Sequence, residues 1–151
     1  MNTISFETDD CFDVRQAARH ISKLYEHHLS KAGITPTQFS ILSELSRNPN
    51  STMLQLADAL VMDRTTLVRV LKPLQRDGFV VAPAEARCRR RLCLMLTGRG
   101  HEKLAQAAVH WGDAQANFER TFGQQQATHL RSELFRITRD VPATDNPKAT
   151  N

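Results

Sequence analysis

Long hydrophobic runs are missing from this sequence of 151 residues. No apolar stretch approaches the roughly 18 residues that a membrane-spanning helix requires. The first residues, MNTISFETDD, have neither the basic start nor the apolar core of a signal peptide. Cysteine is scarce as well: three residues, an odd number at uneven spacing, argue against the disulfide framework of a small secreted protein. We therefore expect a cytoplasmic protein.

Residue patterns that carry metal or covalent chemistry are also lacking. The cysteines and the six histidines do not show the spacing of zinc ligands. No local cysteine–histidine motif indicates a nucleophile with its base. We expect no metal, no cofactor and no enzyme activity. A thiol enzyme that uses Cys11 or Cys88 with a histidine base is the alternative from another class.

Acidic residues are scarce in one part of the chain. Residues 64–103 hold ten of the twenty lysines and arginines but only three carboxylates, whereas the whole chain has a net charge of only +4. Such a local excess of positive charge is typical of a surface that binds nucleic acid. A solvated basic face is the alternative, and the spacing of the residues has to decide between the two.

Apolar residues recur every three to four positions through most of the chain, which predicts amphipathic helices. The expected order is four helices, a β-hairpin and two further helices, which is a mainly α (α+β) fold. The apolar alternation of residues 92–96 predicts the returning strand of the hairpin. The expected N-caps are Thr35, Ser51, Asp63 and Thr97, and the glycines expected to end helices are Gly33, Gly78 and Gly123.

The helix that follows Asp63 is the most informative, because its two faces differ sharply. At about 100° per residue, four apolar residues fall on one face: Leu67, Val70, Leu71 and Leu74. The opposite face holds Thr65, Arg69, Lys72 and Arg76. Ordinary surface helices mix both signs of charge, but this outer face has no carboxylate. Two short helices joined by a tight turn and followed by a hairpin describe a winged helix-turn-helix, whose second helix enters the major groove of DNA.

Three runs of sequence carry a family resemblance: ITPTQFSIL, LADALVMDRTTLVRVLKPLQRDGFV and RRRLCLMLTGRG. Together they make residues 12–140 similar to the MarR (multiple antibiotic resistance regulator) family of winged-helix transcription factors. The resemblance implies a sequence-specific DNA-binding regulator, most often a repressor, that binds a pseudo-palindromic operator as a homodimer. It places the recognition helix in the major groove and a wing arginine, here Arg90, in the minor groove.

The predicted DNA contacts combine this resemblance with the charge pattern. On the recognition helix they are Arg64, Thr65, Thr66, Arg69, Lys72 and Arg76. Near the starts of the two preceding helices they are Gln38, Ser51 and Thr52. On the wing they are Arg87, Arg89, Arg90 and Arg91.

The chain outside the winged domain favours dimerisation on its own. The first helix and the last two are long and apolar on one face, yet they have little winged domain to cover, so a second copy would bury them. We divide the chain into a flexible N-terminus (1–9), an N-terminal dimerisation helix (10–34), a winged helix-turn-helix DNA-binding domain (35–97), C-terminal dimerisation helices (98–140) and a disordered tail (141–151).

The resemblance also implies release from DNA by a small aromatic or phenolic acid. Arg15 and Arg19, one helical turn apart, are candidates to pair with its carboxylate. Phe39, Leu42 and Trp111 are candidates for the apolar walls of the pocket. Intersubunit salt bridges for the arginines and core positions for the apolar residues are the equally open alternative.

The wing departs from the family pattern at one position. The family usually places an aspartate two residues before the wing arginine, and Cys88 stands there, so the usual positioning pair is missing. Either another group such as Glu85 orients Arg90, or the wing is looser and contributes mainly charge. A redox-sensing regulator of the same fold is therefore an alternative. Cys88 lies among arginines and Cys11 at the start of a helix, and both settings favour a thiolate. A nonspecific architectural DNA binder is a further alternative. The operator and the effector cannot be derived from the sequence.

Overall fold

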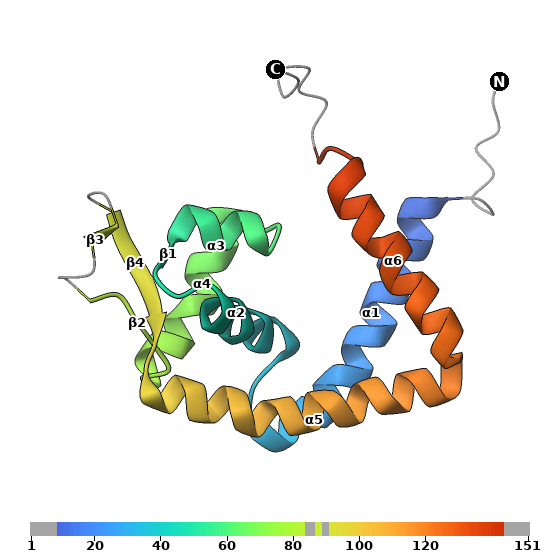
Figure 1. Ribbon diagram of the computed structural model, residues 1–151, viewed down its shortest axis with the longest axis horizontal. Helices are drawn as coiled ribbons and strands as arrows, with labels where there is room; N and C mark the ends of the chain where they lie inside the picture. The colour runs from blue at the N-terminus through green and yellow to red at the C-terminus, as the bar shows by residue number, and fades with distance from the viewer. Residues whose placement is uncertain (1–8, 84–86, 89–90, 144–151) are drawn as a thin grey trace. The chain divides into compact units, whose positions relative to one another are not determined.

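The structure, a computed structural model, describes residues 9–83, 87–88 and 91–143, with the backbone alone at residues 87, 88 and 91. The chain divides into two compact units between Ala114 and Gln115. The elements, labelled in Figure 1 except for η2, are α1 (Asp10–Leu29), the short 3-10 turn η2 (Ser30–Ala32), α2 (Pro36–Arg47), β1 (Ser51–Thr52), α3 (Met53–Ala59), α4 (Arg64–Arg76), β2 (Val80–Val81), β3 (Arg87–Cys88), β4 (Arg91–Leu96), α5 (Gly98–Phe122) and α6 (Gln124–Asp140). The expected flexible N-terminus (1–9) and disordered tail (141–151) lie almost wholly outside the described residues.

Polar caps start the helices of the first unit as the sequence predicts, with one exception. Thr35 and Gln38 form a reciprocal capping box on α2, and Pro36 occupies its first turn. Asp63 caps α4. The expected cap Ser51 is wrong: the cap of α3 is Thr52, which forms a second capping box with Gln55. Ser51 instead belongs to β1, a two-residue strand that is too short to leave a periodic pattern in the sequence.

The turn between α3 and α4 defines the helix-turn-helix. The backbone N–H groups of Val61 and Met62 donate to the carbonyls of Asp58 and Ala57, which closes the end of α3 with the hydrogen bonds of a Schellman motif. Val61 takes the left-handed conformation (φ 52°) that this motif requires. A β-branched residue rarely adopts that conformation, so the turn is held by its hydrogen bonds and not by the preference of its residue.

The sheet is small and antiparallel, with β4 at its centre. β1 and β2 pair with opposite edges of β4, with Ser51 opposite Leu94 and Val80 opposite Leu96. β3 pairs with the start of β4 to form the hairpin. The sequence predicts the hairpin but not the strand β1, which ties the start of α3 to the sheet.

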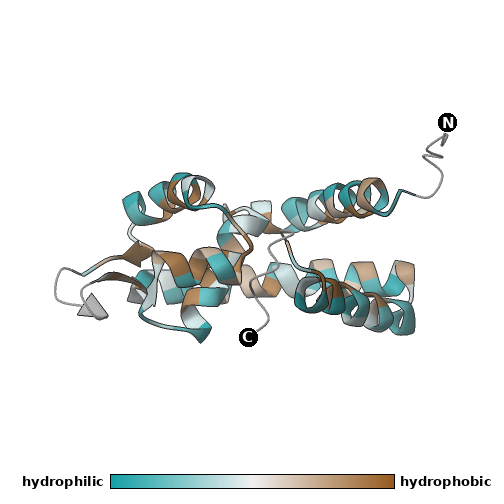
Figure 2. Ribbon diagram, turned by 90° about the horizontal axis from the view of Figure 1, so that it is seen from above, coloured by the Kyte–Doolittle hydropathy of each residue, from teal (hydrophilic) through white to brown (hydrophobic). Residues whose placement is uncertain are grey.

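The core of the first unit lies between α2, α3, α4 and the sheet. Its largest fully buried side chains are Leu29, Ile41, Leu42, Leu45, Leu56, Leu67, Leu71, Leu74 and Cys93. Figure 2 shows hydrophobic and hydrophilic residues alternating along the helices, as expected of helices with one buried face. The aromatic ring of Trp111 on α5 stacks on that of Phe39 at 4.3 Å between ring centroids, which joins α5 to this core.

The start of α5 is joined closely to the chain that follows α4. The Thr97 hydroxyl donates to the Gly78 carbonyl (2.6 Å) and accepts from the Gly100 N–H (3.0 Å), which confirms Thr97 as the cap of α5. Gly100 faces the backbone of Phe79, and a Cβ at position 100 would overlap the Phe79 carbonyl oxygen. Gly100 is therefore required by the close approach of two backbones, not by a special backbone conformation.

Replacing Gly100 with alanine should destabilise the protein, because the added methyl group forces α5 away from Phe79. We expect a loss of about 1–3 kcal/mol in the free energy of unfolding, measured by urea denaturation. Gly112→Ala on the same helix is the control, since nothing lies within 4 Å of its Cβ position. It should stabilise the helix by about 0.5–1 kcal/mol. Equal effects of the two variants would contradict the close contact.

The second unit consists of the end of α5 and α6. The rings of Phe118 and Phe122 stack at 5.1 Å. Gly123 then ends α5 with φ 106°, as the sequence predicts. The Arg131 guanidinium donates to the Glu119 carboxylate across the turn (2.8 Å). In the part of the chain that the structure describes, no helix is long and apolar enough to cross a membrane.

Candidate nucleic-acid interface

The two faces of α4 are as different in the structure as in the sequence. Leu67, Leu71 and Leu74 are buried, each at most 1% exposed. Their burial turns the opposite side of the helix outward, and the exposed residues there include Arg64, Thr65, Arg69, Lys72 and Arg76. The predicted recognition helix is thus held by its leucines and presents a basic stripe, which we define as Arg64, Arg69 and Lys72.

The cations of this basic stripe form no ion pair with any described residue, whereas several exposed arginines elsewhere do. Arg47, Arg131, Arg136 and Arg139 each contact a carboxylate at 2.6–2.9 Å. Among the described residues, none accepts a hydrogen bond from Arg64, Arg69 or Lys72. The helix therefore presents uncompensated positive charge along one face, which suits a polyanion such as the DNA backbone.

The start of α4 is fixed by Asp63 and Thr66. One Asp63 carboxylate oxygen accepts from the Thr66 N–H (2.8 Å) and the other from the Thr66 hydroxyl (2.7 Å). These two hydrogen bonds, the hydroxyl one foremost, lower the pKa of the Asp63 carboxyl below its ordinary value of 3.8. Thr66, a predicted DNA contact, therefore uses its hydroxyl within the protein, whereas the neighbouring Thr65 is exposed.

The depressed pKa of Asp63 links this cap to the stability of the protein at low pH. A group whose pKa is lower when folded stabilises the folded state above its unfolded pKa, and this stabilisation disappears as pH falls through the folded pKa. Asp63→Ala should therefore lower the unfolding temperature at pH 7, and its difference from the wild type should shrink as pH falls below about 4. Asp63→Asn, which can still accept from the backbone, is the matched control. The measurement is thermal unfolding by circular dichroism from pH 2 to pH 7. A difference between wild type and Asp63→Ala that stays constant over this range would contradict the role of the charged cap.

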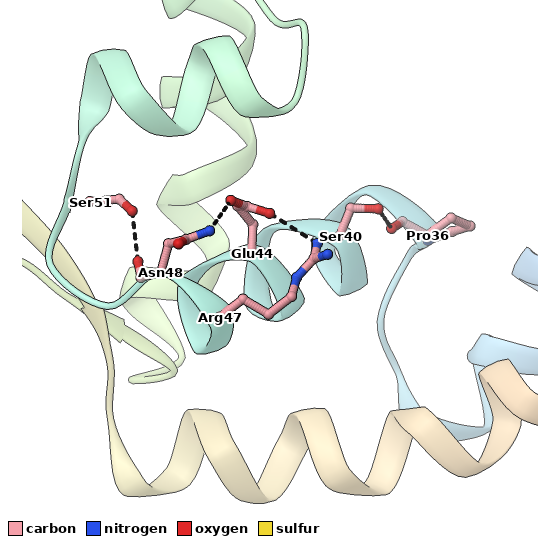
Figure 3. A network of polar contacts seen from close by, with 6 residues as sticks. All are labelled: Pro36, Ser40, Glu44, Arg47, Asn48 and Ser51. Carbon is pink, nitrogen blue, oxygen red and sulfur yellow. Dashed lines mark hydrogen bonds and ion pairs between the residues drawn. The ribbon is translucent and has the colours of Figure 1, made fainter. Parts of the chain in front are cut away.

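Three other predicted contacts are engaged as helix caps or turn residues. The Gln38 side chain accepts from the Thr35 N–H (2.9 Å). Ser51 and Thr52 are each only 8% exposed. Figure 3 shows the Ser51 hydroxyl donating to the Asn48 carbonyl (2.6 Å), next to a network in which Glu44 accepts from both Asn48 and Arg47. Burial of Ser51 and Thr52 favours a structural role for these two residues over a DNA contact.

The wing is only partly described. Arg87 and Arg91 lie on the paired strands β3 and β4, with Arg87 opposite Leu92 and Arg91 opposite Cys88. Arg89 and Arg90 lie outside the described residues. The predicted minor-groove contact by Arg90 therefore stays a prediction.

The residues predicted for an effector pocket occupy different environments. Arg15 and Arg19 are exposed on α1. Phe39 and Leu42 are buried, and Phe39 stacks on Trp111, which also contacts the ring of Tyr25 at 4.4 Å. Two cavities, of about 480 and 450 Å³, are lined by other residues.

The cysteines take separate places. Cys11 is exposed and free in the first turn of α1. Cys93 on β4 is fully buried and is disulfide-bonded, a bond that the odd number and uneven spacing of the cysteines did not predict. Cys88 lies on β3, and its side chain is not among those described. No group of three or more potential metal ligands occurs among the described residues.

Comparison with known proteins decides the family. The family model of the MarR family matches residues 32–91. The crystal structure of the transcriptional regulator MosR of M. tuberculosis is 30% identical, with a TM-score of 0.77 over 89% of this chain and 96% of that chain. The chain belongs to the MarR family.

Further relatives of this MarR-family protein are also regulators by name. A second structure of MosR, in complex with DNA, is 33% identical with a TM-score of 0.75, over 87% of this chain and 94% of that chain. A putative transcriptional regulatory protein for the hcr operon of Thauera aromatica is 33% identical over 91 residues, which are 60% of this chain and 51% of that protein. The match thus spans about half the length of this curated relative. The winged-helix fold and a regulator instead of an enzyme agree with the expectation from the sequence.

Proposed function

We propose that this MarR-family protein binds a pseudo-palindromic DNA operator as a homodimer and regulates transcription, as a repressor that acts in the cytoplasm. The observation that carries the proposal is the basic stripe of α4, whose cations have no carboxylate partner among the described residues. Elsewhere on the described surface, arginines that form ion pairs have their positive charge balanced by a carboxylate. The relative MosR, whose structure was determined in complex with DNA, supports the same assignment.

Within the stripe, Arg69 is the proposed base-reading residue. It lies in the middle of the exposed face of α4, between Arg64 and Lys72, and an arginine there can donate two parallel hydrogen bonds to a guanine edge. Arg64, close to the start of the helix, and Lys72 are proposed to contact phosphates. The wing arginines, with Arg90 foremost, are proposed to grip the neighbouring backbone and minor groove.

Arg69→Ala should weaken operator binding by about 1–3 kcal/mol and relax base preference, because one bidentate contact is lost. Fluorescence anisotropy with an operator found by genomic footprinting measures this at fixed salt. Arg136→Ala, which removes an exposed arginine paired with Glu133 on α6, is the matched control and should leave binding unchanged. Equal losses on operator and random DNA would make Arg69 a phosphate contact, and no loss on either would refute the interface.

The homodimer is supported by apolar side chains that each unit leaves exposed. In the first unit α1 exposes Phe12 and Val14. In the second, the exposed apolar residues are Phe122, Leu134, Phe135 and Ile137. Exposed clusters of this kind mark surfaces that bind another protein chain. A symmetric dimer, the most frequent closed assembly, would bury them against a second copy.

Leu134→Asp should raise the dimer dissociation constant at least tenfold, because it places a carboxylate in an apolar interface. Sedimentation velocity over a range of protein concentrations measures the change. Ser132→Asp adds the same charge two residues away, on the opposite side of α6, and should have little effect. A wild-type protein that sediments as a monomer at micromolar concentration would overturn the dimer.

The effector that we propose is a small aromatic or phenolic acid. Arg15 and Arg19 are exposed and one turn apart on α1, so both guanidinium groups are available to a carboxylate. Phe39 and Trp111, stacked on each other in the same unit, are the proposed apolar side of the site. Loss of operator binding on addition of salicylate, abolished in Arg15→Gln, is the corresponding test.

A further inference from the structure

A cavity of the first unit lies beyond the C-terminal end of the basic stripe. Its volume is about 480 Å³, and it opens where the end of α4, the start of β2 and the first turns of α5 meet. We call it the basic pocket, and its lining residues are Ala32, Gly33, Arg76, Asp77, Phe79, Arg99 and Lys103. All of them belong to the first unit.

Two cations are gathered around one aromatic ring in this pocket. The Arg99 guanidinium carbon lies 5.4 Å and the Lys103 Nζ 5.6 Å from the centroid of the Phe79 ring. Contact with the ring face holds a cation in place without neutralising it. The Phe79 ring therefore organises two positive charges within one wall of the pocket.

Lys103 is held more firmly than Arg99. Its Nζ donates to the Ala32 carbonyl and to the Gln106 side chain, both at 3.0 Å, and an ammonium group has three protons to donate. Neither partner is an anion, so the charge of Lys103 is oriented but not balanced. Arg99 has no hydrogen-bond acceptor among the described residues, so its whole donor edge is available.

The charges that line the basic pocket do not cancel. Arg76 contacts Asp77 at 3.0 Å, which raises the pKa of Arg76 and leaves this pair neutral. Arg99 and Lys103 then leave the pocket with two positive charges. Glu102 lines the adjoining hollow beside them, but it forms no ion pair with either cation in the described structure. A dianion is the ligand that would balance these charges.

The frame of the pocket is fixed before any ligand binds. Gly100 is packed against the Phe79 backbone, and Thr97 ties the start of α5 to Gly78. Arg99 and Lys103 lie on the first turns of α5, so this packing sets where both side chains start. A preorganised pair of cations loses less entropy on binding than flexible surface side chains do.

The basic pocket adjoins the C-terminal end of the basic stripe. Arg76 follows Lys72 by four residues, roughly 6 Å along α4, and follows Arg64 by twelve residues, roughly 18 Å. A cavity of this volume is in the range of small-molecule sites, and the concave wall suits a compact ligand better than a duplex. We propose that the basic pocket binds a phosphorylated small molecule, whose dianionic phosphate is held by Arg99 and Lys103. This inference does not depend on DNA binding.

Inorganic pyrophosphate is the probe for this site, measured by isothermal titration calorimetry on the full chain at constant ionic strength. We expect saturable binding of one pyrophosphate per chain. Arg99→Gln should raise its dissociation constant at least tenfold, because a fork of charged donors is lost. Arg99→Lys should restore part of the affinity. Both variants should fold, since the Arg99 side chain makes no hydrogen bond in the described structure.

Arg139→Gln is the matched control. Arg139 lies over the ring of Phe135 at 5.8 Å, in a similar cation–π contact on α6, and its removal should change pyrophosphate affinity less than twofold. Absence of saturable binding, or equal losses in Arg99→Gln and Arg139→Gln, would overturn the proposal and leave only diffuse attraction to a basic protein. DNA affinity is measured in parallel with the same variants. A loss of DNA binding in Arg99→Gln with intact pyrophosphate binding would also overturn it, by making the pocket part of the DNA interface.

Discussion

The burial of one face of α4 is the constraint on which the rest of the winged unit depends. Leu67, Leu71 and Leu74 recur at helical spacing, and each contributes about 1.5–3 kcal/mol when fully removed from water. Because these leucines fix the rotation of the helix about its axis, the side chains on the other face point into solvent. Arg69 and Lys72 are exposed for this reason. The hydrophobic core thus determines which residues can meet DNA, although none of its own atoms would touch it.

The end of α4 is joined to α5 by contacts with the backbone, and these contacts fix the position of the start of α5 relative to α4. Gly78, which follows the end of α4, has a left-handed backbone conformation, and its carbonyl accepts a hydrogen bond from the Thr97 hydroxyl. Gly100 has no side chain and therefore lets the backbone of Phe79 approach closely. These contacts place Phe79 beneath Arg99 and Lys103. A ligand in the basic pocket would touch residues next to both the recognition helix and α5, so its binding energy would act on the junction between them.

Much of the fold follows from the sequence because the relevant interactions are local. Capping residues such as Thr35 and Asp63 satisfy N–H groups three residues away, so their effect can be predicted from neighbours in the chain. The strand β1 could not be predicted, since two residues carry no period and the pairing with Leu94 is long-range. Ser51 was wrongly predicted as a cap for the same reason. The basic pocket could not be predicted from the sequence either, because only tertiary packing brings Arg76, Phe79 and Lys103 together.

Arg76 illustrates how tertiary packing can divide one charged face into two sites. By helical spacing alone it belongs with Arg69 and Lys72, and the sequence therefore groups it with the DNA contacts. In the structure Asp77 neutralises it, and it lines a cavity with Phe79 and with residues from η2 and α5. A neutralised arginine adds little to long-range attraction of a polyanion, whereas the uncompensated cations at Arg64, Arg69 and Lys72 keep that attraction. Ion pairing therefore separates Arg76 from the residues on the same face of α4 that would hold DNA.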